Sequence, residues 1–343
     1  MALNNPTKPL MPEKVLLIQP KQIGDVLMTT PAVRELYRRI PNGEIHFLTQ
    51  PPSDQIFAYN PYISKVIKIP KKPKFSEVIS MLRQLRKEHY TTIVDFQGMP
   101  NTAVISRLIG ARKRIGFNLK GRALFYTHPV DKQEHVHYSA LQKMNLLSSL
   151  GVNSRDAKLD FFITEKERTK AKQILSGIGV SGNRPLISVS PVSRRDYKVW
   201  PARYFAQVCD HLADKYAAQI LFLWGPGEFH FVKKVKDKMK RSALPKYDMP
   251  SISETVALLE SVDLHLGNDN GPMHFAIAAG TKTVAVFGRP LMKNWTPPDN
   301  PRHLAVEYDP GCKNSCVYPK CGLECLKDLT PEMVIKKVDE HLG

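Results

Sequence analysis

Short runs of apolar residues alternate along this chain with longer segments whose apolar residues recur every three or four positions. The runs of the first half predict strands at Val15–Ile18, Glu44–Leu48 and Thr92–Phe96, and its longer segments predict helices over 26–39, 75–89, 101–109 and 137–150. The second half predicts strands at Leu186–Ser190, Ile220–Trp224, Val262–Leu266 and Thr283–Phe287, with helices near 165–176, 201–215, 228–241 and 272–280. A final amphipathic helix is predicted over Pro331–Leu342, with Thr330 as its N-cap.

Strands that alternate with helices indicate parallel sheets covered by helices on both faces. The polar, irregular stretch Gly151–Asp160 separates two such alternating halves. A chain of 343 residues is also too long for one ordinary core, so two domains are expected, 1–158 and 159–343. The predicted fold class is therefore α/β, with two doubly wound domains that face a cleft. Ligands of such sheets bind beyond the carboxyl ends of the strands.

Composition adds a strong basic excess to this picture. The formal net charge of +18 predicts an anionic partner, which is nucleic acid, a membrane surface or an anionic substrate. No zinc-finger spacing, RNA-binding strand motif or long Lys/Arg block supports nucleic acid. The basic residues form small clusters such as Lys71–Lys72–Lys74 and Arg112–Lys113–Arg114, a distribution that suits an anionic membrane surface or a merely solvated face.

Membrane spans and export signals are not predicted. No apolar run approaches the ~20 residues that cross a bilayer. The segment Met1–Glu13 lacks the apolar core of a signal peptide, so a cytoplasmic location is expected.

The first predicted turn carries an acidic residue where a dinucleotide site would carry glycines. Val15–Ile18 is followed by Gln19–Asp25, which holds Gly24 alone and ends on a carboxylate at the start of a helix. Because a carboxylate repels phosphate, this turn is not expected to hold a nucleotide. Asp25 suits either a base that acts on another substrate or a helix N-cap.

The second half contains the turn that the first half lacks. Gly267–His274 follows a predicted strand, and Gly271 and Pro272 suit a close approach of the backbone and the start of a helix. The free N–H groups there can hold an anion. Asp269 suits a helix cap as well, and His274 faces either a ligand or the core.

Two further turns of the second half offer groups that suit a nucleotide. Ser193 and Lys198 can reach a diphosphate, while Trp200 beside them is expected to pack in the core. Glu228 at a helix start can accept from ribose hydroxyls or complement the helix dipole. Taken together, the three turns predict a nucleotide-diphosphate site in the second domain. Asp25, in the other domain, then fits a base for transfer of the group attached to the diphosphate.

Four of the five cysteines lie close together near the C-terminus. Their positions are Cys312, Cys316, Cys321 and Cys325. A cytoplasmic location argues against disulfides, and the spacing differs from the paired C-x2-C pattern of zinc sites. Reduced thiols are expected, and metal binding is the alternative.

Five segments along nearly the whole chain form a recognisable set: Gly24–Asp25 followed by Thr29–Ala32, then Tyr90–Gly98, Lys198–Pro201, Asp269–His274 and Leu329–Val334. In the same order, they resemble glycosyltransferase family 9, the lipopolysaccharide core heptosyltransferases. The resemblance implies a GT-B fold of two Rossmann-like domains. It also implies an inverting transfer of L-glycero-D-manno-heptose from ADP-heptose to an inner-core sugar, without a metal or other cofactor.

The same resemblance assigns roles to individual residues. Asp25 matches the general base, Lys198 the lysine at the donor diphosphate, and Ser193 a hydroxyl residue beside it. Glu228 matches an acidic residue near the nucleoside. The phosphate-side turn of the donor site corresponds to Asp269, Asn270, Gly271, Met273 and His274. This chain has Asn270 where some relatives have threonine, and the cysteine cluster occurs in only part of the family.

An N-terminal acceptor-binding domain and a C-terminal donor-binding domain are therefore expected, in an enzyme that works at the inner face of the cytoplasmic membrane. The phosphorylated lipopolysaccharide acceptor would be the anionic partner that the basic charge of the chain predicts. Two other functions stay open: a GT-B enzyme that uses another nucleotide-sugar, and a non-catalytic nucleic-acid-binding protein.

Overall fold

The computed structural model describes residues 13–288, 292–312 and 316–343. Contacts within the chain divide it into two compact units. The first unit holds the described residues through Val136 together with Ala140–Ala157, and the second holds His137–Ser139 and Lys158–Gly343. The long continuous part of the second unit begins at Lys158, whereas the sequence analysis expects the second domain to begin at residue 159.

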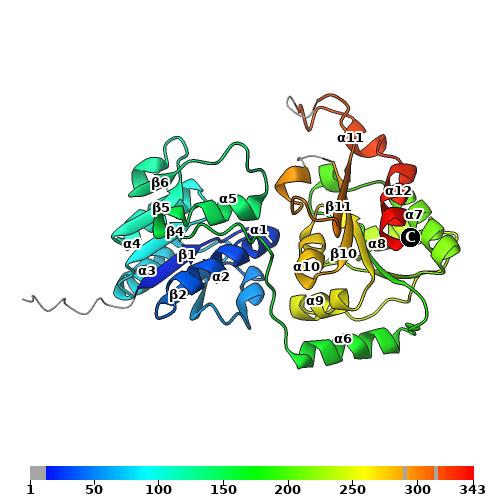
Figure 1. Cartoon of the computed structure of the whole chain (residues 1–343), viewed down its shortest axis with the longest axis horizontal. Helices are drawn as coiled ribbons and strands as arrows, with labels where there is room; N and C mark the ends of the chain where they lie inside the picture. The colour runs from blue at the N-terminus through cyan, green and yellow to red at the C-terminus, as the bar shows by residue number, and fades with distance from the viewer. Residues whose placement is uncertain (1–12, 289–291, 313–315) are drawn as a thin grey trace, which may run out of the picture. The chain divides into compact units, whose positions relative to one another are not determined.

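The first unit is built on a six-stranded parallel sheet with the strand order β3-β2-β1-β4-β5-β6 (Figure 1). Its strands are β1 (Lys14–Ile18), β2 (Glu44–Thr49), β3 (Lys65–Lys68), β4 (Thr92–Asp95), β5 (Lys113–Phe117) and β6 (His128–Val130). Its helices are α1 (Ile23–Leu27), α2 (Thr30–Arg39), α3 (Phe75–Lys87), α4 (Pro100–Ile109) and α5 (Ser139–Asn145), with short 3-10 turns η1 (Ser53–Phe57), η2 (Ala123–Phe125) and η3 (Ser148–Leu150). α2 and the pair α3 and α4 cover opposite faces of the sheet (Figure 1).

Apolar strands and one helix stripe form the core between this sheet and α3. Leu16, Ile18 and Ile93 are fully buried, and they pack with Leu82 and Leu85 of α3. Strands that are buried on both faces are rich in apolar residues, which is why β1, β2 and β4 are visible in the sequence although His46 interrupts the apolar run of β2.

Three predictions for the first unit need correction. The single helix expected over 26–39 is two helices, because the hydroxyls of Thr29 and Thr30 donate to the carbonyls of Val26 and Leu27, at 2.7 and 2.8 Å. Only Ser139–Asn145 of the helix expected over 137–150 is α-helical. β3, β5 and β6 were not predicted, because β3 and β5 begin with charged residues and β6 is only the three residues His128–Val130.

The second unit is built on a five-stranded parallel sheet with the order β11-β10-β9-β7-β8. Its strands are β7 (Leu186–Ser190), β8 (Gln219–Phe222), β9 (Leu264–Asn268), β10 (Lys282–Phe287) and β11 (His303–Glu307). The α-helices are α6 (Glu165–Gly177), α7 (Ala202–Tyr216), α8 (Phe229–Lys236), α9 (Ile252–Glu260), α10 (Gly271–Ala279), α11 (Glu324–Lys327) and α12 (Pro331–Leu342). Two 3-10 turns, η4 (Asp196–Lys198) and η5 (Met292–Asn294), complete the described elements.

Helices cover both faces of this sheet as well, with α7, α8 and α12 on one face and α9 and α10 on the other (Figure 1). Trp200 is fully buried, and its indole Nε1 donates to the carbonyl of Leu329 at 2.8 Å. The expectation that this tryptophan packs is confirmed. It holds the turn after β7 against the segment that leads into α12.

The second unit also departs from the predicted elements. β8 ends at Phe222 rather than Trp224, and α8 ends at Lys236 rather than near residue 241. α9 and β11 were not predicted. β9 begins at Leu264, two residues later than expected, because Asp263 turns its carboxylate back to accept from the N–H of Leu186 at 2.8 Å.

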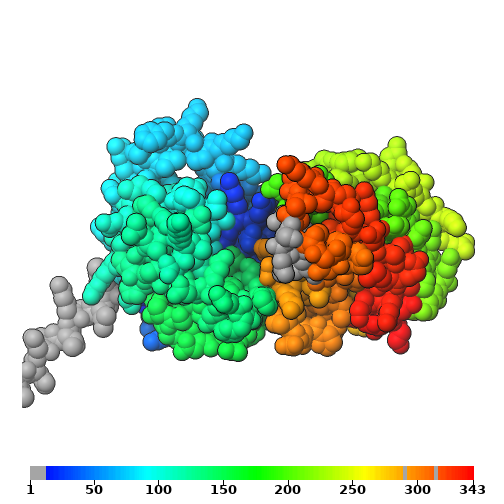
Figure 2. All heavy atoms as spheres, turned by 90° about the horizontal axis from the view of Figure 1, so that it is seen from above, coloured from blue at the N-terminus to red at the C-terminus, as the bar shows by residue number. Residues whose placement is uncertain are grey.

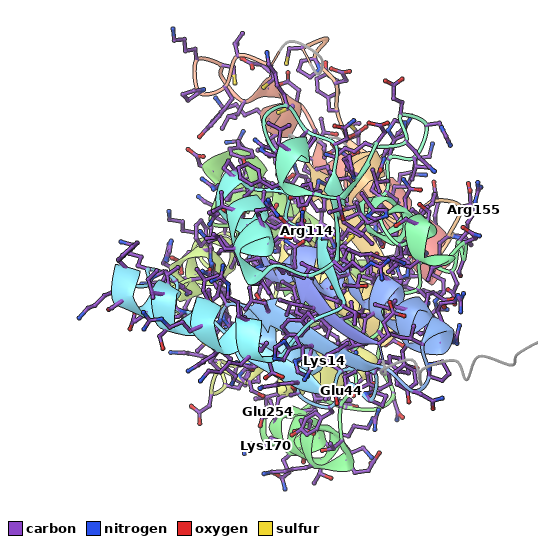
Figure 3. The ribbon with its side chains drawn as sticks, turned by 90° about the vertical axis from the view of Figure 1, so that its left-hand side faces the viewer. Lys14, Glu44, Arg114, Arg155, Lys170 and Glu254 are labelled. Carbon is purple, nitrogen blue, oxygen red and sulfur yellow. The ribbon has the colours of Figure 1, made fainter. Side chains whose placement is uncertain are left out.

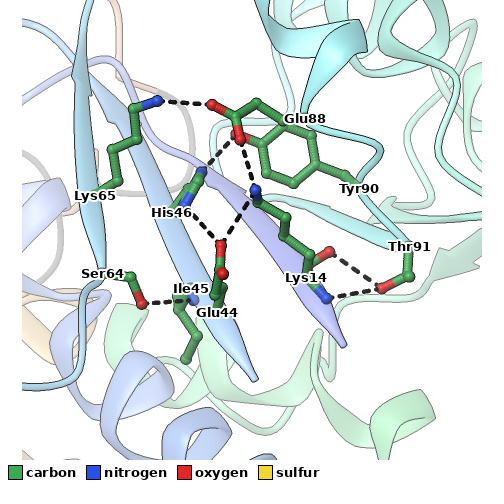
Figure 4. A network of polar contacts seen from close by, with 9 residues as sticks. All are labelled: Lys14, Glu44, Ile45, His46, Ser64, Lys65, Glu88, Tyr90 and Thr91. Carbon is green, nitrogen blue, oxygen red and sulfur yellow. Dashed lines mark hydrogen bonds and ion pairs between the residues drawn. The ribbon is translucent and has the colours of Figure 1, made fainter. Parts of the chain in front are cut away.

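A polar network closes the amino edge of the first sheet (Figure 4). The ammonium of Lys14 lies 2.6 Å from Glu88 and 3.1 Å from Glu44, and Lys65 lies 2.7 Å from Glu88. Buried His46 shares a 2.8 Å hydrogen bond with the hydroxyl of Tyr90, and burial lowers the pKa of His46. Two lysines that donate to one carboxylate lower the pKa of Glu88 to about 2. The network ties the starts of β1, β2 and β3 to the end of α3.

We expect Glu88→Gln to lower the free energy of unfolding by about 1 kcal/mol at pH 7, since one carboxylate serves two lysines. The pKa of Glu88 is lowered in the folded state, from 4.5 to about 2, so its stabilisation is present above pH 4.5 and is lost between those values. Urea unfolding at pH 7 and at pH 3 measures both effects. Glu134→Gln, at an exposed position, is the matched control. An equal loss of unfolding free energy in both variants would contradict the stabilising role of Glu88. So would a difference in unfolding free energy between the wild type and Glu88→Gln that is the same at pH 7 and pH 3.

Candidate functional site

Asp25 lies just beyond the carboxyl end of β1, in the first turn of α1. The helix begins at Ile23 and its N-cap is Gln22, so Asp25 occupies the third helical position. The alternative reading of Asp25 as an N-cap is therefore wrong. Its side chain keeps 27% of its surface exposed, which leaves the carboxylate open to a substrate.

A buried lysine faces this carboxylate. Lys143 comes from α5, far along the chain, and its ammonium lies 3.9 Å from Oδ1 of Asp25. Burial lowers the pKa of Lys143, and the nearby carboxylates of Asp25 and Asp95 oppose that shift. The ammonium also donates to Oε1 of Gln19 at 2.8 Å. Lys143 thus places a fixed donor and a positive charge behind the exposed carboxylate.

Two glutamines connect this lysine to the end of β4. Nε2 of Gln19 donates to Oε1 of Gln97 at 2.9 Å, and the N–H of Lys21 donates to the same oxygen at 3.0 Å. Asp95, the last residue of β4, is fully buried and accepts from the N–H groups of Gln97 and Gly98, at 3.0 and 3.1 Å. Burial raises the pKa of Asp95. These bonds fix the turn that carries Asp25.

In the second unit, Lys198 and Asp269 bring two of the predicted turns together. Nζ of Lys198, at the end of η4, lies 2.5 Å from Oδ2 of Asp269, which follows β9. β7 and β9 are neighbours, with Ser190 opposite Gly267, so their turns emerge side by side. The side chain of Asp269 is 4% exposed and that of Lys198 is 18% exposed. The lysine is the more accessible partner.

The cap of α10 is Asn270, not Asp269. Oδ1 of Asn270 accepts from the N–H of Met273 at 3.1 Å, and its Nδ2 donates to Oγ of Ser190 and to the carbonyl of Val192, both at 2.9 Å. The suggestion that Asp269 caps this helix is therefore wrong. Asn270 uses its side chain to shape the turn.

The remaining residues of the α10 turn are mostly buried. Met273 is 1% exposed, and its N–H is engaged by Asn270. His274 is 3% exposed, and burial together with the charge of Lys198 lowers its pKa to about 3. Its Nδ1 is buried and makes no hydrogen bond to the described residues. At neutral pH His274 is therefore an uncharged ring beneath the turn, and Gly271 is the first helical residue.

An ion pair joins the turn before α8 to the turn that follows β7. Nε of Arg194 lies 3.9 Å from Oε1 of Glu228, which is the N-cap of α8. Oε2 of Glu228 accepts from the N–H of Gly225 at 2.9 Å, and a Cβ at Gly225 would lie 2.8 Å from that oxygen and would displace the carboxylate. Ser193 is 8% exposed, and its Oγ accepts from the N–H of Arg195 at 3.2 Å.

Sequence reasoning missed the residues that support these sites. Lys143 was detectable as a single lysine on the buried face of a helix that also carries Ala140 and Met144. Arg194 lies inside the segment already singled out. Gln19 and Gln97 each follow a strand, but their bonds to Lys143 and to each other come from the tertiary fold.

The cysteine cluster offers no assembled metal centre in the part of the chain that the structure describes. Cys312, Cys316, Cys321 and Cys325 are half-buried free thiols, and burial raises the pKa of Cys325. Across residues 13–288, 292–312 and 316–343, no group of three or more His, Cys, Asp or Glu residues is arranged to hold a metal ion.

Solved structures with the same architecture include several glycosyltransferases. A family 9 glycosyl transferase from Veillonella parvula matches with a TM-score of 0.81 and 23% identity, over 96% of this chain and 97% of that one. The Escherichia coli ADP-heptose lps heptosyltransferase II matches with a TM-score of 0.78 and 18% identity, over 96% and 98%. These likenesses establish the GT-B fold, with two parallel-sheet α/β domains.

Sequence comparison gives the family. Lipopolysaccharide heptosyltransferase 1 of Campylobacter coli is 25% identical over 295 residues, which cover 80% of this chain and 84% of that protein. The model of glycosyltransferase family 9 (heptosyltransferase) matches residues 78–325, well over half of the chain. The chain therefore belongs to glycosyltransferase family 9, the heptosyltransferases, and is a glycosyltransferase.

Proposed function

We propose that this enzyme transfers L-glycero-D-manno-heptose from ADP-heptose to a sugar of the lipopolysaccharide inner core, with inversion at the anomeric carbon. The observation that carries the proposal is the Lys198–Asp269 pair, which joins two strand-end turns of the second unit around the partly exposed ammonium of Lys198. The names of the similar heptosyltransferases support both the heptose donor and the lipopolysaccharide acceptor.

In this reaction the acceptor hydroxyl attacks C1 of the heptose, and the bond between C1 and the diphosphate oxygen breaks. Asp25 takes the proton of the attacking hydroxyl, and ADP leaves with the electron pair. The partial exposure of the Asp25 side chain supports this role. The ammonium of Lys143 holds the carboxylate in place.

Lys198 and the N–H groups of the α10 turn would stabilise the charge that builds on the leaving diphosphate. Ser193 would add a hydroxyl donor beside it, and Glu228 would accept from the ribose. The proposal therefore gives acceptor binding to the first domain (1–158) and donor binding to the second (159–343). It includes no metal, and transfer in the presence of a chelator checks that part.

The proposed acceptor also bears on where in the cell the enzyme works. Among the described helices, none is both long enough and apolar enough to cross a bilayer. We propose that the protein works as a peripheral enzyme at the inner face of the cytoplasmic membrane, where its lipid-linked acceptor is made.

The direct experiment incubates the purified protein with ADP-heptose and lipopolysaccharide acceptors truncated at successive core sugars. We expect ADP release together with the mass gain of one heptose on one acceptor. Turnover with another nucleotide-sugar in place of ADP-heptose would contradict the proposed donor.

A binding measurement tests the donor separately. At 100 times its dissociation constant a ligand stabilises the folded state by about 2.7 kcal/mol, so ADP is expected to raise Tm by roughly 5 °C. UDP and GDP at equal concentrations serve as controls and should raise it much less. Equal shifts for the three nucleotides would show that the site does not select adenine.

A further inference from the structure

Half of the basic excess of the chain lies in one segment of the first unit. Residues 71–130 contain twelve lysines and arginines and three acidic residues, a formal charge of +9 out of +18. One of the acidic residues, Asp95, is fully buried, and a second, Glu88, is bonded to Lys14 and Lys65. The surface of this segment is therefore strongly positive.

The same segment exposes large apolar side chains. Leu124 is 87% exposed and Phe75 is 82% exposed, and Met99, Val104 and Leu108 are between 38% and 49% exposed. Five of the eight exposed large apolar residues in the described chain thus lie within residues 71–130. Single exposed apolar residues are ordinary, but a group of them among charges marks an interaction surface.

These residues come from neighbouring elements. α3 and α4 pack side by side, and Nε of Arg86 donates to the carbonyl of Leu108 at 2.6 Å. η2 packs against α4, and Arg122 donates to the carbonyl of Gly98 at 3.1 Å. We call the following residues the α3–α4 face: Lys71, Lys72, Lys74, Phe75, Met99, Val104, Arg107, Leu108 and Leu124.

The starts of α3 and α4 lie at the carboxyl edge of the sheet, because both helices connect parallel strands. Phe75 and Met99 stand at those starts, and Lys71, Lys72 and Lys74 lead into α3. Asp25 follows β1 at the same edge. Figure 2 shows this region, light blue to cyan, at the surface of the first unit, and Figure 3 shows side chains tipped with nitrogen along α3.

We propose that the α3–α4 face docks on an anionic lipid bilayer and presents the carboxyl edge of the first sheet to a lipid-linked acceptor, an inference that rests on the proposed function. Phe75 and Leu124 insert at the level of the headgroups, and the lysines and Arg107 pair with lipid phosphates. A second copy of this face would be repelled by its charge. Nucleic acid would leave the exposed aliphatic side chains without a partner.

Flotation with vesicles tests the proposal. The wild-type protein should float with vesicles of equimolar phosphatidylcholine and phosphatidylglycerol, and not with phosphatidylcholine alone. Phe75→Ser/Leu124→Ser and Lys71→Glu/Lys72→Glu/Lys74→Glu should each weaken binding roughly tenfold or more. Binding of the wild-type protein to these vesicles should also weaken at about 1 M salt, because the Debye length there is about 3 Å and the attraction between lysines and lipid phosphates is screened.

Matched controls come from the second unit. Met249→Ser/Val317→Ser removes exposed apolar side chains, and Lys233→Glu/Lys234→Glu/Lys238→Glu reverses exposed charges. Both controls should float like the wild type. Equal losses in controls and test variants would overturn the proposal. The proposal would also be overturned if the wild-type protein bound DNA tightly or formed a dimer, and if Phe75→Ser/Leu124→Ser, unlike the control variants, abolished that binding.

A soluble, deacylated acceptor separates this proposal from the proposed function. The face variants should transfer heptose to it at the wild-type rate. Normal transfer without flotation of the wild type would overturn the docking proposal alone. Flotation without heptose transfer to any acceptor would overturn the proposed function instead.

Discussion

Replacing Asp25 with asparagine is expected to lower kcat for heptose transfer at least ~100-fold, the range for a positioned acid or base. The amide keeps the size of the side chain but cannot take the proton of the acceptor hydroxyl. Because the groups proposed for the donor lie in the second unit, the rise in Tm caused by ADP should not change. Single-turnover transfer and thermal unfolding with ADP measure the two effects.

Asp54→Asn is the matched control for this variant. Asp54 is another carboxylate of the first unit paired with a lysine, Lys68, at 2.7 Å, and its side chain is 11% exposed. It should leave kcat near the wild-type value. Near-normal transfer by Asp25→Asn would remove Asp25 from the mechanism. A loss of ADP binding together with transfer would instead indicate a general disturbance of the fold.

The sequence was most informative where burial alone decides the structure. β7 has the predicted bounds Leu186–Ser190 because every residue in it is buried and its apolar residues are interrupted only by small serines. β5 begins with Lys113 and Arg114, so its apolar pattern is broken and only pairing with β4 reveals it. The break before α2 depends on threonine hydroxyls that compete for helix carbonyls.

The residues of the candidate site also fall into those that the sequence could place and those that it could not. Residues that follow strands could be placed at a carboxyl edge from the sequence, as Asp25 and Lys198 were. Their partners could not be identified, because a side chain such as Lys143 reaches Asp25 only after the sheet has formed. Asn270 shows a second limit: its amide is consumed by Ser190, Val192 and Met273, and residue type alone gives no sign of this.

Lys198→Met is expected to lower kcat ~100- to 1,000-fold and to weaken donor binding, since it removes the ammonium that joins the two turns of the proposed diphosphate site. The same change removes the ammonium that lies 2.5 Å from the buried carboxylate of Asp269, and breaking a buried pair costs about 3–5 kcal/mol of stability. Transfer by the single variant would therefore fall through both chemistry and unfolding. A second variant has to separate the two.

Lys198→Met/Asp269→Asn supplies that separation, because it neutralises the buried carboxylate as well as removing the cation. We expect its Tm to return towards the wild-type value while kcat stays low. Arg195→Met, which removes an exposed cation from the same turn, should keep transfer near normal. If the double variant regains transfer along with stability, Lys198 acts by holding the two turns together. If it regains stability alone, the positive charge of Lys198 is itself required for departure of the diphosphate.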